Sequence, residues 1–138
     1  MDVNETTVIV KIILDFYSDV EAVYLFGTYG TAGEGGGSDV DIALLLPPHG
    51  AKSVKNLAMS PCRHALETAL RRTIDLVNLR MANTVFQHEI IKEGRVIYKT
   101  GDYPVDCFEM TAMSLYQKLN EERSGILREV MRSGRILC

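Results

Sequence analysis

A glycine-rich segment between two short apolar runs constrains the fold of this chain more than any other feature. Residues 22–26 read Ala-Val-Tyr-Leu-Phe, and residues 39–46 end in five consecutive apolar side chains, so both runs are typical of buried strands. Six glycines lie within the twelve residues 27–38 that separate them. Pro47 and Pro48 end the second run, because a strand interior excludes proline. The pattern predicts two strands joined by a connection of small residues.

The rest of the chain alternates between helical and strand patterns. Apolar residues at helical spacing predict helices, and short β-branched runs predict strands. The predicted helices cover residues 7–20, 55–72 with a start near Ser60, 84–93 after an Asn83 cap, and 105–132; the predicted strands cover 72–79 and 95–98; and residues 49–54 and 101–104 are predicted to be a loop and a turn. This order favours a small α/β (α+β) sandwich, with one mixed sheet covered by helices on one face and a C-terminal helix that extends outside that core.

Composition and charge narrow the class of protein. The 138 residues fit one domain, and 46% hydrophobic with 24% charged side chains is ordinary for a globular protein. The net charge of -3 lacks the basic excess of proteins that bind the nucleic-acid backbone, so no direct nucleic-acid binding is expected. The longest apolar run, residues 42–46, is far too short to span a membrane. An acidic N-terminus and three widely spaced cysteines favour a reduced, cytoplasmic protein.

Three aspartates are the strongest candidates for chemistry. Asp39 and Asp41 are two residues apart at a predicted strand start, so their side chains point to one face, roughly 6–7 Å apart. Such a pair is also common on a solvent-facing strand that has no function. Asp75, between Ile74 and Leu76, lies in a strand predicted to be buried, where an ionised carboxylate needs a partner. If Asp75 lies beside the pair, the three carboxylates suit Mg²⁺, which takes oxygen ligands from carboxylates and substrate phosphates.

The glycine-rich segment adds a candidate phosphate site. Backbone N–H groups in a tight glycine turn can bind phosphate oxygens, and the Thr28 hydroxyl supplies another donor. The spacing of Gly27, Gly30 and Gly33 is not the dinucleotide-binding fingerprint, and no Gly-Lys-Ser/Thr sequence marks a P-loop. A phosphate site joined by a short connection to paired carboxylates is what metal-dependent phosphoryl or nucleotidyl transfer needs.

These residues resemble the signature of a known superfamily. Gly27-Thr28, ten further residues and then Asp39-Val40-Asp41 are similar to the GS-x10-DxD motif of the DNA polymerase β-like nucleotidyltransferases. The short chain resembles the minimal nucleotidyltransferase (MNT) family within that superfamily. The combination of motif and third aspartate is more specific than any of its parts.

The resemblance extends over most of the chain. Asp75, residues 93–98 and the tail around residues 116–127 are similar to the corresponding parts of MNT proteins, as is the helix before the motif. The resemblance therefore implies a minimal nucleotidyltransferase core over residues 1–104. Residues 105–138 would then form a C-terminal helical segment of the same domain.

The resemblance also implies a function. MNT proteins are commonly antitoxins whose partner is a HEPN-type ribonuclease toxin, and they transfer AMP from ATP to a tyrosine of that toxin. ATP would be the substrate, Mg²⁺ the cofactor and the toxin the partner, with Asp75 activating the attacking hydroxyl. The implied site residues are, for nucleotide binding, Gly27, Thr28 and Ser38, and, for catalysis and metal binding, Asp39, Asp41 and Asp75.

Departures from the family motif leave other functions open. Thr28 replaces the usual serine, and Thr31 replaces an arginine that would neutralise phosphate charge. A catalytically weak antitoxin that acts by binding alone, or a nucleotidyltransferase of a small molecule, is therefore an alternative. Residues 120–135 are predicted to contact the toxin or a second copy of the chain, because an apolar stripe beyond Gly125 would project from the domain.

Overall fold

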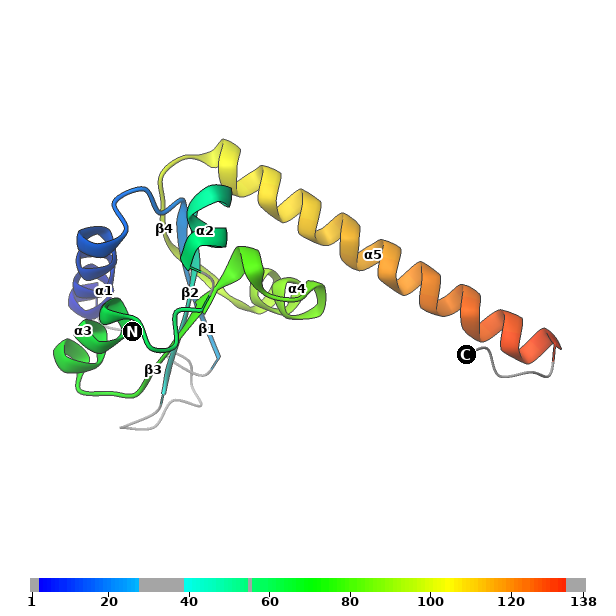
Figure 1. Cartoon of the computed structure of the whole chain (residues 1–138), viewed down its shortest axis with the longest axis horizontal. Coiled ribbons are helices and arrows are strands. Elements are labelled where there is room, and N and C mark those ends of the chain that lie inside the picture. Colours follow the sequence, from blue (N-terminus) through cyan, green and yellow to red (C-terminus); the bar gives the residue numbers. More distant parts are fainter. Residues whose placement is uncertain (1–2, 28–38, 55, 134–138) are drawn as a thin grey trace.

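A four-stranded sheet lies at the centre of the part of the chain that the computed structural model describes, residues 3–27, 39–54 and 56–133 (Figure 1). Its strands are β1 (Ala22–Phe26), β2 (Val40–Leu45), β3 (Ile74–Asn78) and β4 (Arg95–Lys99), in the order β3-β2-β1-β4. β1 is antiparallel to β2 and β4, whereas β2 and β3 are parallel. This mixed sheet confirms the predicted α+β class.

Helices precede, connect and follow the strands. Their bounds are α1 Val3–Phe16, α2 Pro48–Val54, α3 Pro61–Leu70, α4 Thr84–Glu93 and α5 Asp102–Ser133, with a short 3-10 helix, η1, at Leu79–Met81. The side chains of Ser60 and Asn83 accept hydrogen bonds from the backbone N–H groups of Arg63 and Phe86, at 3.2 and 2.8 Å. These N-caps confirm the predicted starts of α3 and α4. α1 begins and ends earlier than the predicted range 7–20.

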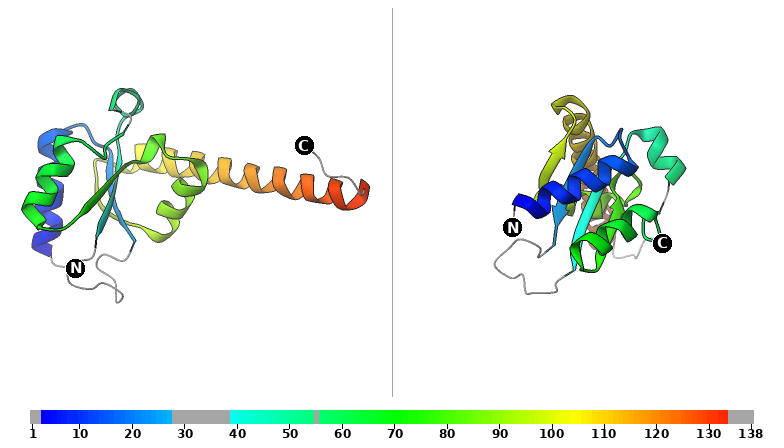
Figure 2. Two further views of the ribbon diagram at one scale, coloured as in Figure 1. Left: turned by 60° about the horizontal axis from the view of Figure 1, so that its bottom comes forward. Right: turned by 90° about the vertical axis from the view of Figure 1, so that its left-hand side faces the viewer.

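Helices cover both faces of the sheet (Figure 2). α1 and α3 pack on one face, where Val23 and Leu25 of β1 are buried. α4 and the first turns of α5 pack on the other face, where Ala22 and Tyr24 are buried. The prediction of helices on one face only is therefore wrong. Its physical reason lies in β1 and β2, which are buried at nearly every position instead of alternating between apolar and polar residues.

α2 occupies residues that the sequence predicts to be a loop. Pro48 begins the helix, and the N–H group of Ala51 donates a 2.8 Å hydrogen bond to the carbonyl oxygen of Pro47. The Ala51 side chain is fully buried in the core beside α1 and α3. Proline suits the first turn of a helix, so the Pro-Pro pair that ends β2 also begins α2.

The last helix, α5, is anchored to the sheet only by its first turns. It begins at Asp102 rather than at residue 105, and Tyr24 Oη of β1 donates a 2.8 Å hydrogen bond to its Glu109 Oε1. Beyond these turns the helix extends away from the sheet (Figures 1 and 2) and continues through residues 124–125, where glycine predicts a weak point. The buried residues of α5, among side chains that the structure describes, are Val105, Phe108 and Ala112.

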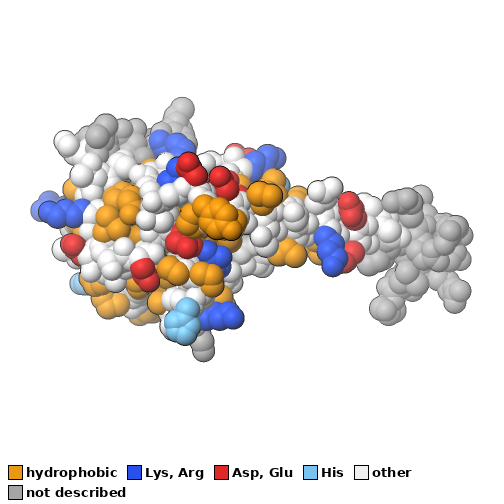
Figure 3. Space-filling view, turned by 90° about the horizontal axis from the view of Figure 1, so that it is seen from above, with side chains coloured by type: hydrophobic (Ala, Val, Ile, Leu, Met, Phe, Trp, Pro, Cys, Tyr) orange, Lys and Arg blue, Asp and Glu red, His pale blue; other side chains and the backbone are white. Residues whose placement is uncertain are grey.

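Exposed apolar side chains gather on the first half of α5, and charged side chains follow further along it (Figure 3). Tyr103 is 80% exposed and Met110 is 70% exposed, while Met113 and Leu115 are also exposed. None of the helices in the described ranges has both the length and the apolar character needed to cross a membrane.

Candidate active site

Asp41 and Asp75 lie side by side at one end of the sheet. Their Cα atoms are register partners in the parallel pair of β2 and β3, and neighbouring strands are about 4.8 Å apart. Val40 and Ile42, on either side of Asp41, are buried in the core beneath α1 and α3, as strand alternation predicts. The Asp41 side chain therefore points to the opposite face, on the side of α4 and α5.

The backbone of Gly27 lies directly against the Asp41 carboxylate. Gly27 follows β1 and has a φ of +77°, a left-handed conformation that side-chain-bearing residues rarely adopt. A Cβ atom at this position would lie 2.1 Å from Asp41 Oδ2. Only glycine fits here, so the first residue of the predicted phosphate segment and the second aspartate of the pair form one site.

The three aspartates interact electrostatically. The pKa of Asp41 is raised above its ordinary value, first by burial and then by the negative charges of Asp75 and Asp39. Each of these causes disfavours the ionised form of Asp41. A cation bound between the carboxylates would reverse the effect.

Asp75 differs from the sequence prediction in its exposure. The prediction that it is a buried carboxylate is wrong, because its side chain is exposed while Ile74 and Leu76 on either side are buried. β3 lies at the edge of the sheet, and its Asp75 face is open at this end. Asp75 therefore keeps its charge in contact with water and is accessible to a substrate.

The oxygen donors at this end of the sheet fit Mg²⁺. This ion commonly binds proteins through one or two carboxylates and completes its shell with water and substrate phosphates. In the described part of the chain, no group of three or more His, Cys, Asp or Glu side chains is arranged to hold a metal ion. The fit therefore depends on the paired aspartates, whose mutual repulsion a cation would relieve.

The predicted nucleotide contacts are only partly covered by the structure. Gly27 and Asp39 are described, and Asp39 is exposed at the start of β2. Thr28 and Ser38 lie outside the described residues, as does Thr31.

An aromatic pair closes the sheet face beside the aspartates. Phe26 is the register partner of Asp41 across β1 and β2, and its ring meets that of Phe86 edge to face, with the ring centroids 5.7 Å apart. Phe86 belongs to α4, so this contact brings α4 next to the acidic end of the sheet. The sequence does not indicate this pair, since its two members are sixty residues apart.

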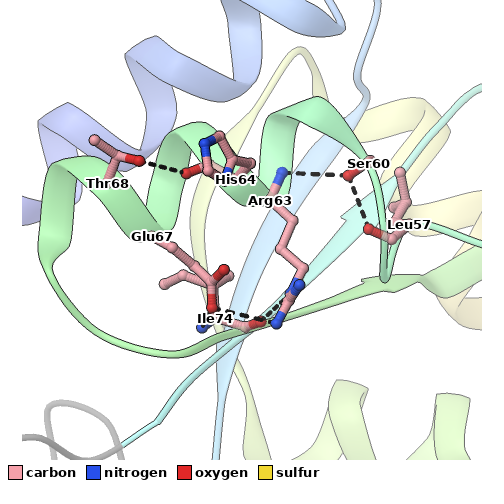
Figure 4. A network of polar contacts seen from close by, with 7 residues as sticks. All are labelled: Leu57, Ser60, Arg63, His64, Glu67, Thr68 and Ile74. Carbon is pink, nitrogen blue, oxygen red and sulfur yellow. Dashed lines mark hydrogen bonds and ion pairs between the residues drawn. The ribbon is translucent and has the colours of Figure 1, made fainter.

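Polar side chains of α3 hold the beginning of β3, which the sequence also does not indicate (Figure 4). Arg63 Nε donates a 2.8 Å hydrogen bond to the carbonyl oxygen of Ile74. The N–H group of Ile74 donates to Glu67 Oε2 at 3.1 Å, and Arg63 Nη2 forms an ion pair with the same oxygen at 3.2 Å. Ile74 is the residue immediately before Asp75.

Comparisons with known proteins agree with this arrangement. The sequence model of the family described as polymerase beta, nucleotidyltransferase, matches residues 9–103. The chain is 32% identical over 123 residues to protein adenylyltransferase MntA of Shewanella oneidensis, covering 89% of this chain and 85% of that protein.

Two solved structures are similar over nearly the whole chain. A crystal structure of a toxin–antitoxin with AMP-PNP has a TM-score of 0.70 and 29% identity, covering 94% of this chain and 99% of that chain. A structure of tri-AMPylated Shewanella oneidensis HEPN toxin in complex with MNT antitoxin has a TM-score of 0.68 and 29% identity, covering 95% and 99%.

Proposed function

This chain belongs to the polymerase β nucleotidyltransferase family, and we propose that it is an antitoxin that transfers AMP from ATP to a tyrosine of a HEPN-type toxin. One observation carries the chemical part of this proposal: Asp41 and Asp75 are register partners, with the backbone of Gly27 against the Asp41 carboxylate. The similarity to a protein adenylyltransferase and to a complex with an AMPylated HEPN toxin supports the choice of nucleotide and partner.

The residues have distinct roles in the proposed reaction. Asp39 and Asp41 hold Mg²⁺, which neutralises phosphate charge when it is bound. Gly27, Thr28 and Ser38 bind the nucleotide. The tyrosine oxygen attacks the α-phosphorus of ATP, so that a new P–O bond forms, the bond to the bridging oxygen breaks, and pyrophosphate leaves.

Asp75 accepts the phenolic proton in this reaction. Its carboxylate is exposed on the sheet face that it shares with Asp41, so an acceptor hydroxyl can approach it from solvent. The reaction uses ATP and Mg²⁺ and takes place in the cytoplasm.

The experiment that tests this function uses the full chain with labelled ATP, Mg²⁺ and the HEPN-type protein encoded beside it. We expect label on that protein with the wild type and none with the Asp39→Asn, Asp41→Asn double variant, whose circular dichroism spectrum should match the wild type. Equal labelling by the double variant would refute the assigned roles. Tight binding without labelling by the wild type would instead establish an antitoxin that acts by binding alone.

A further inference from the structure

Arg63 and Glu67 of α3 satisfy both backbone groups of Ile74 on the open side of β3. The guanidinium donates to the Ile74 carbonyl oxygen, the carboxylate accepts from the Ile74 N–H group, and the two side chains pair with each other (Figure 4). These four groups form a closed polar arrangement. Both side chains are less than one third exposed, so the arrangement is shielded from water on one side.

This arrangement holds the strand from the side that lacks a neighbouring strand. β3 is an edge strand, and its other side pairs with β2, where the N–H group of Val40 donates to the carbonyl oxygen of Thr73 at 2.9 Å. The backbone next to Asp75 is thus fixed from both sides. A shift of β3 by one residue would turn Asp75 to the opposite face of the sheet, away from Asp41.

A second arginine makes the same kind of contact at the opposite end of the sheet. Arg80 Nε donates a 2.8 Å hydrogen bond to the carbonyl oxygen of Leu46, and its guanidinium forms an ion pair with Glu21. Glu21 precedes β1 and Leu46 follows β2, so this arrangement lies away from the aspartates. It provides a control with matched chemistry and a different location.

We propose that Arg63 and Glu67 are positioning residues that hold Asp75 opposite Asp41 for nucleotidyl transfer, an inference that rests on the proposed function. Neither side chain is assigned a contact with ATP, metal or acceptor. Their effect on the reaction passes through the backbone of Ile74 to the adjacent aspartate. A misplacement of about 1 Å in a reacting group is enough to slow a reaction about 100-fold.

The test compares four variants of the full chain: Arg63→Met, Glu67→Leu, Glu67→Gln and the control Arg80→Met. Glutamine keeps an oxygen that accepts from the Ile74 N–H group, whereas leucine does not. We expect kcat to fall about 10-fold or more in Arg63→Met and Glu67→Leu, with the KM for ATP changing less than about twofold. Glu67→Gln should restore most of kcat, and Arg80→Met should keep it even where its melting temperature falls.

A second measurement reports on the strand without any bound metal or nucleotide. Amide hydrogen exchange of the metal-free protein should become faster for a peptide containing residues 74–75 in Arg63→Met, and should stay at the wild-type rate there in Arg80→Met. The inference is overturned if Arg63→Met and Arg80→Met lose kcat equally, or if exchange at residues 74–75 does not change. Absence of transfer in the wild type would overturn the proposed function, and this inference with it.

Discussion

The Asp41 carboxylate occupies the space that a side chain on Gly27 would need. The distance from a Cβ atom built on Gly27 to Asp41 Oδ2 is only 2.1 Å, and the backbone of Gly27 is left-handed. The end of β1 and the beginning of β2 are therefore complementary at the level of single atoms. Any residue other than glycine must displace the carboxylate that the proposed reaction needs.

The first prediction concerns the Gly27→Ala variant. We expect the free energy of unfolding to fall by about 1–3 kcal/mol, because alanine is strained at positive φ, and transfer to be lost because Asp41 is displaced. Urea denaturation and the labelling assay measure the two effects. Gly101→Ala is the matched control, since nothing lies within 4 Å of a Cβ atom at that position. Equal stability and activity of the two variants would contradict the contact with Asp41.

The second prediction concerns pH and Asp41. Its pKa is raised by burial, Asp75 and Asp39, so the folded protein holds the proton more tightly than the unfolded chain does. As pH rises from the ordinary pKa of aspartate, about 4, through the raised value, the free energy of unfolding falls. Asp41→Asn removes this effect, and the metal-free variant should be more stable than the wild type at pH 7.

The measurement for this prediction is urea denaturation of both proteins with a chelator at pH 3, 5 and 7. At pH 3 the carboxyl is protonated in both states, so the advantage of Asp41→Asn should disappear. An advantage of the same size at pH 3 and pH 7 would show that charge is not its cause.

The third prediction concerns Asp75. Asp75→Asn removes one of the charges that raise the pKa of Asp41, so the melting temperature of the metal-free protein should rise at pH 7, while transfer slows. Asp75 is exposed, and the gain should therefore be smaller than that of Asp41→Asn and should shrink at 1 M salt, where the Debye length is about 3 Å. A lower melting temperature would contradict the repulsion.

The fourth prediction concerns the end of α5. The described side chains after Asn120, residues 121–125, are all exposed, and the helix there extends beyond the sheet. A chain that ends at Asn120 keeps Tyr116, whose ring stacks on His88 with centroids 3.6 Å apart, and should remain folded with weakened binding to its partner. Circular dichroism, titration calorimetry with the HEPN-type protein, and sedimentation to detect self-association measure these effects.

Two results would each refute the fourth prediction. If the truncated chain does not fold, residues beyond 120 are part of the core. If it folds and binds the partner, or a second copy of itself, with wild-type affinity, the interface lies elsewhere.

The sequence predicts local structure well where a single residue determines it. Ser60 and Asn83 start helices because their side chains accept the first free N–H groups, a property that needs no tertiary context. The Pro47-Pro48 pair is ambiguous for the opposite reason, since proline both ends a strand and begins a helix. Whether α2 forms depends on the burial of Ala51, which sequence periodicity over so short a segment does not reveal.

The candidate site could be predicted in its residue types but not in its environment. Alternation on a strand places Asp41 opposite the buried Val40 and Ile42, and this is observed. The exposure of Asp75 depends on β3 lying at the edge of the sheet, which is a matter of strand order and not of its apolar neighbours. The contacts of Arg63 with Ile74 join a helix to the strand that follows it, so only the folded chain reveals them.

The length and continuity of α5 have a consequence for which side chains can be modified. The helix runs for about 30 Å from its last buried residue, Ala112, to Ser133, at 1.5 Å for each residue. If the partner binds near the far end, as the fourth prediction holds, its surface is kept at a set distance from Asp41 and Asp75. Acceptor hydroxyls would then be selected by their reach from the bound surface, like marks on a ruler, and not by the sequence around them.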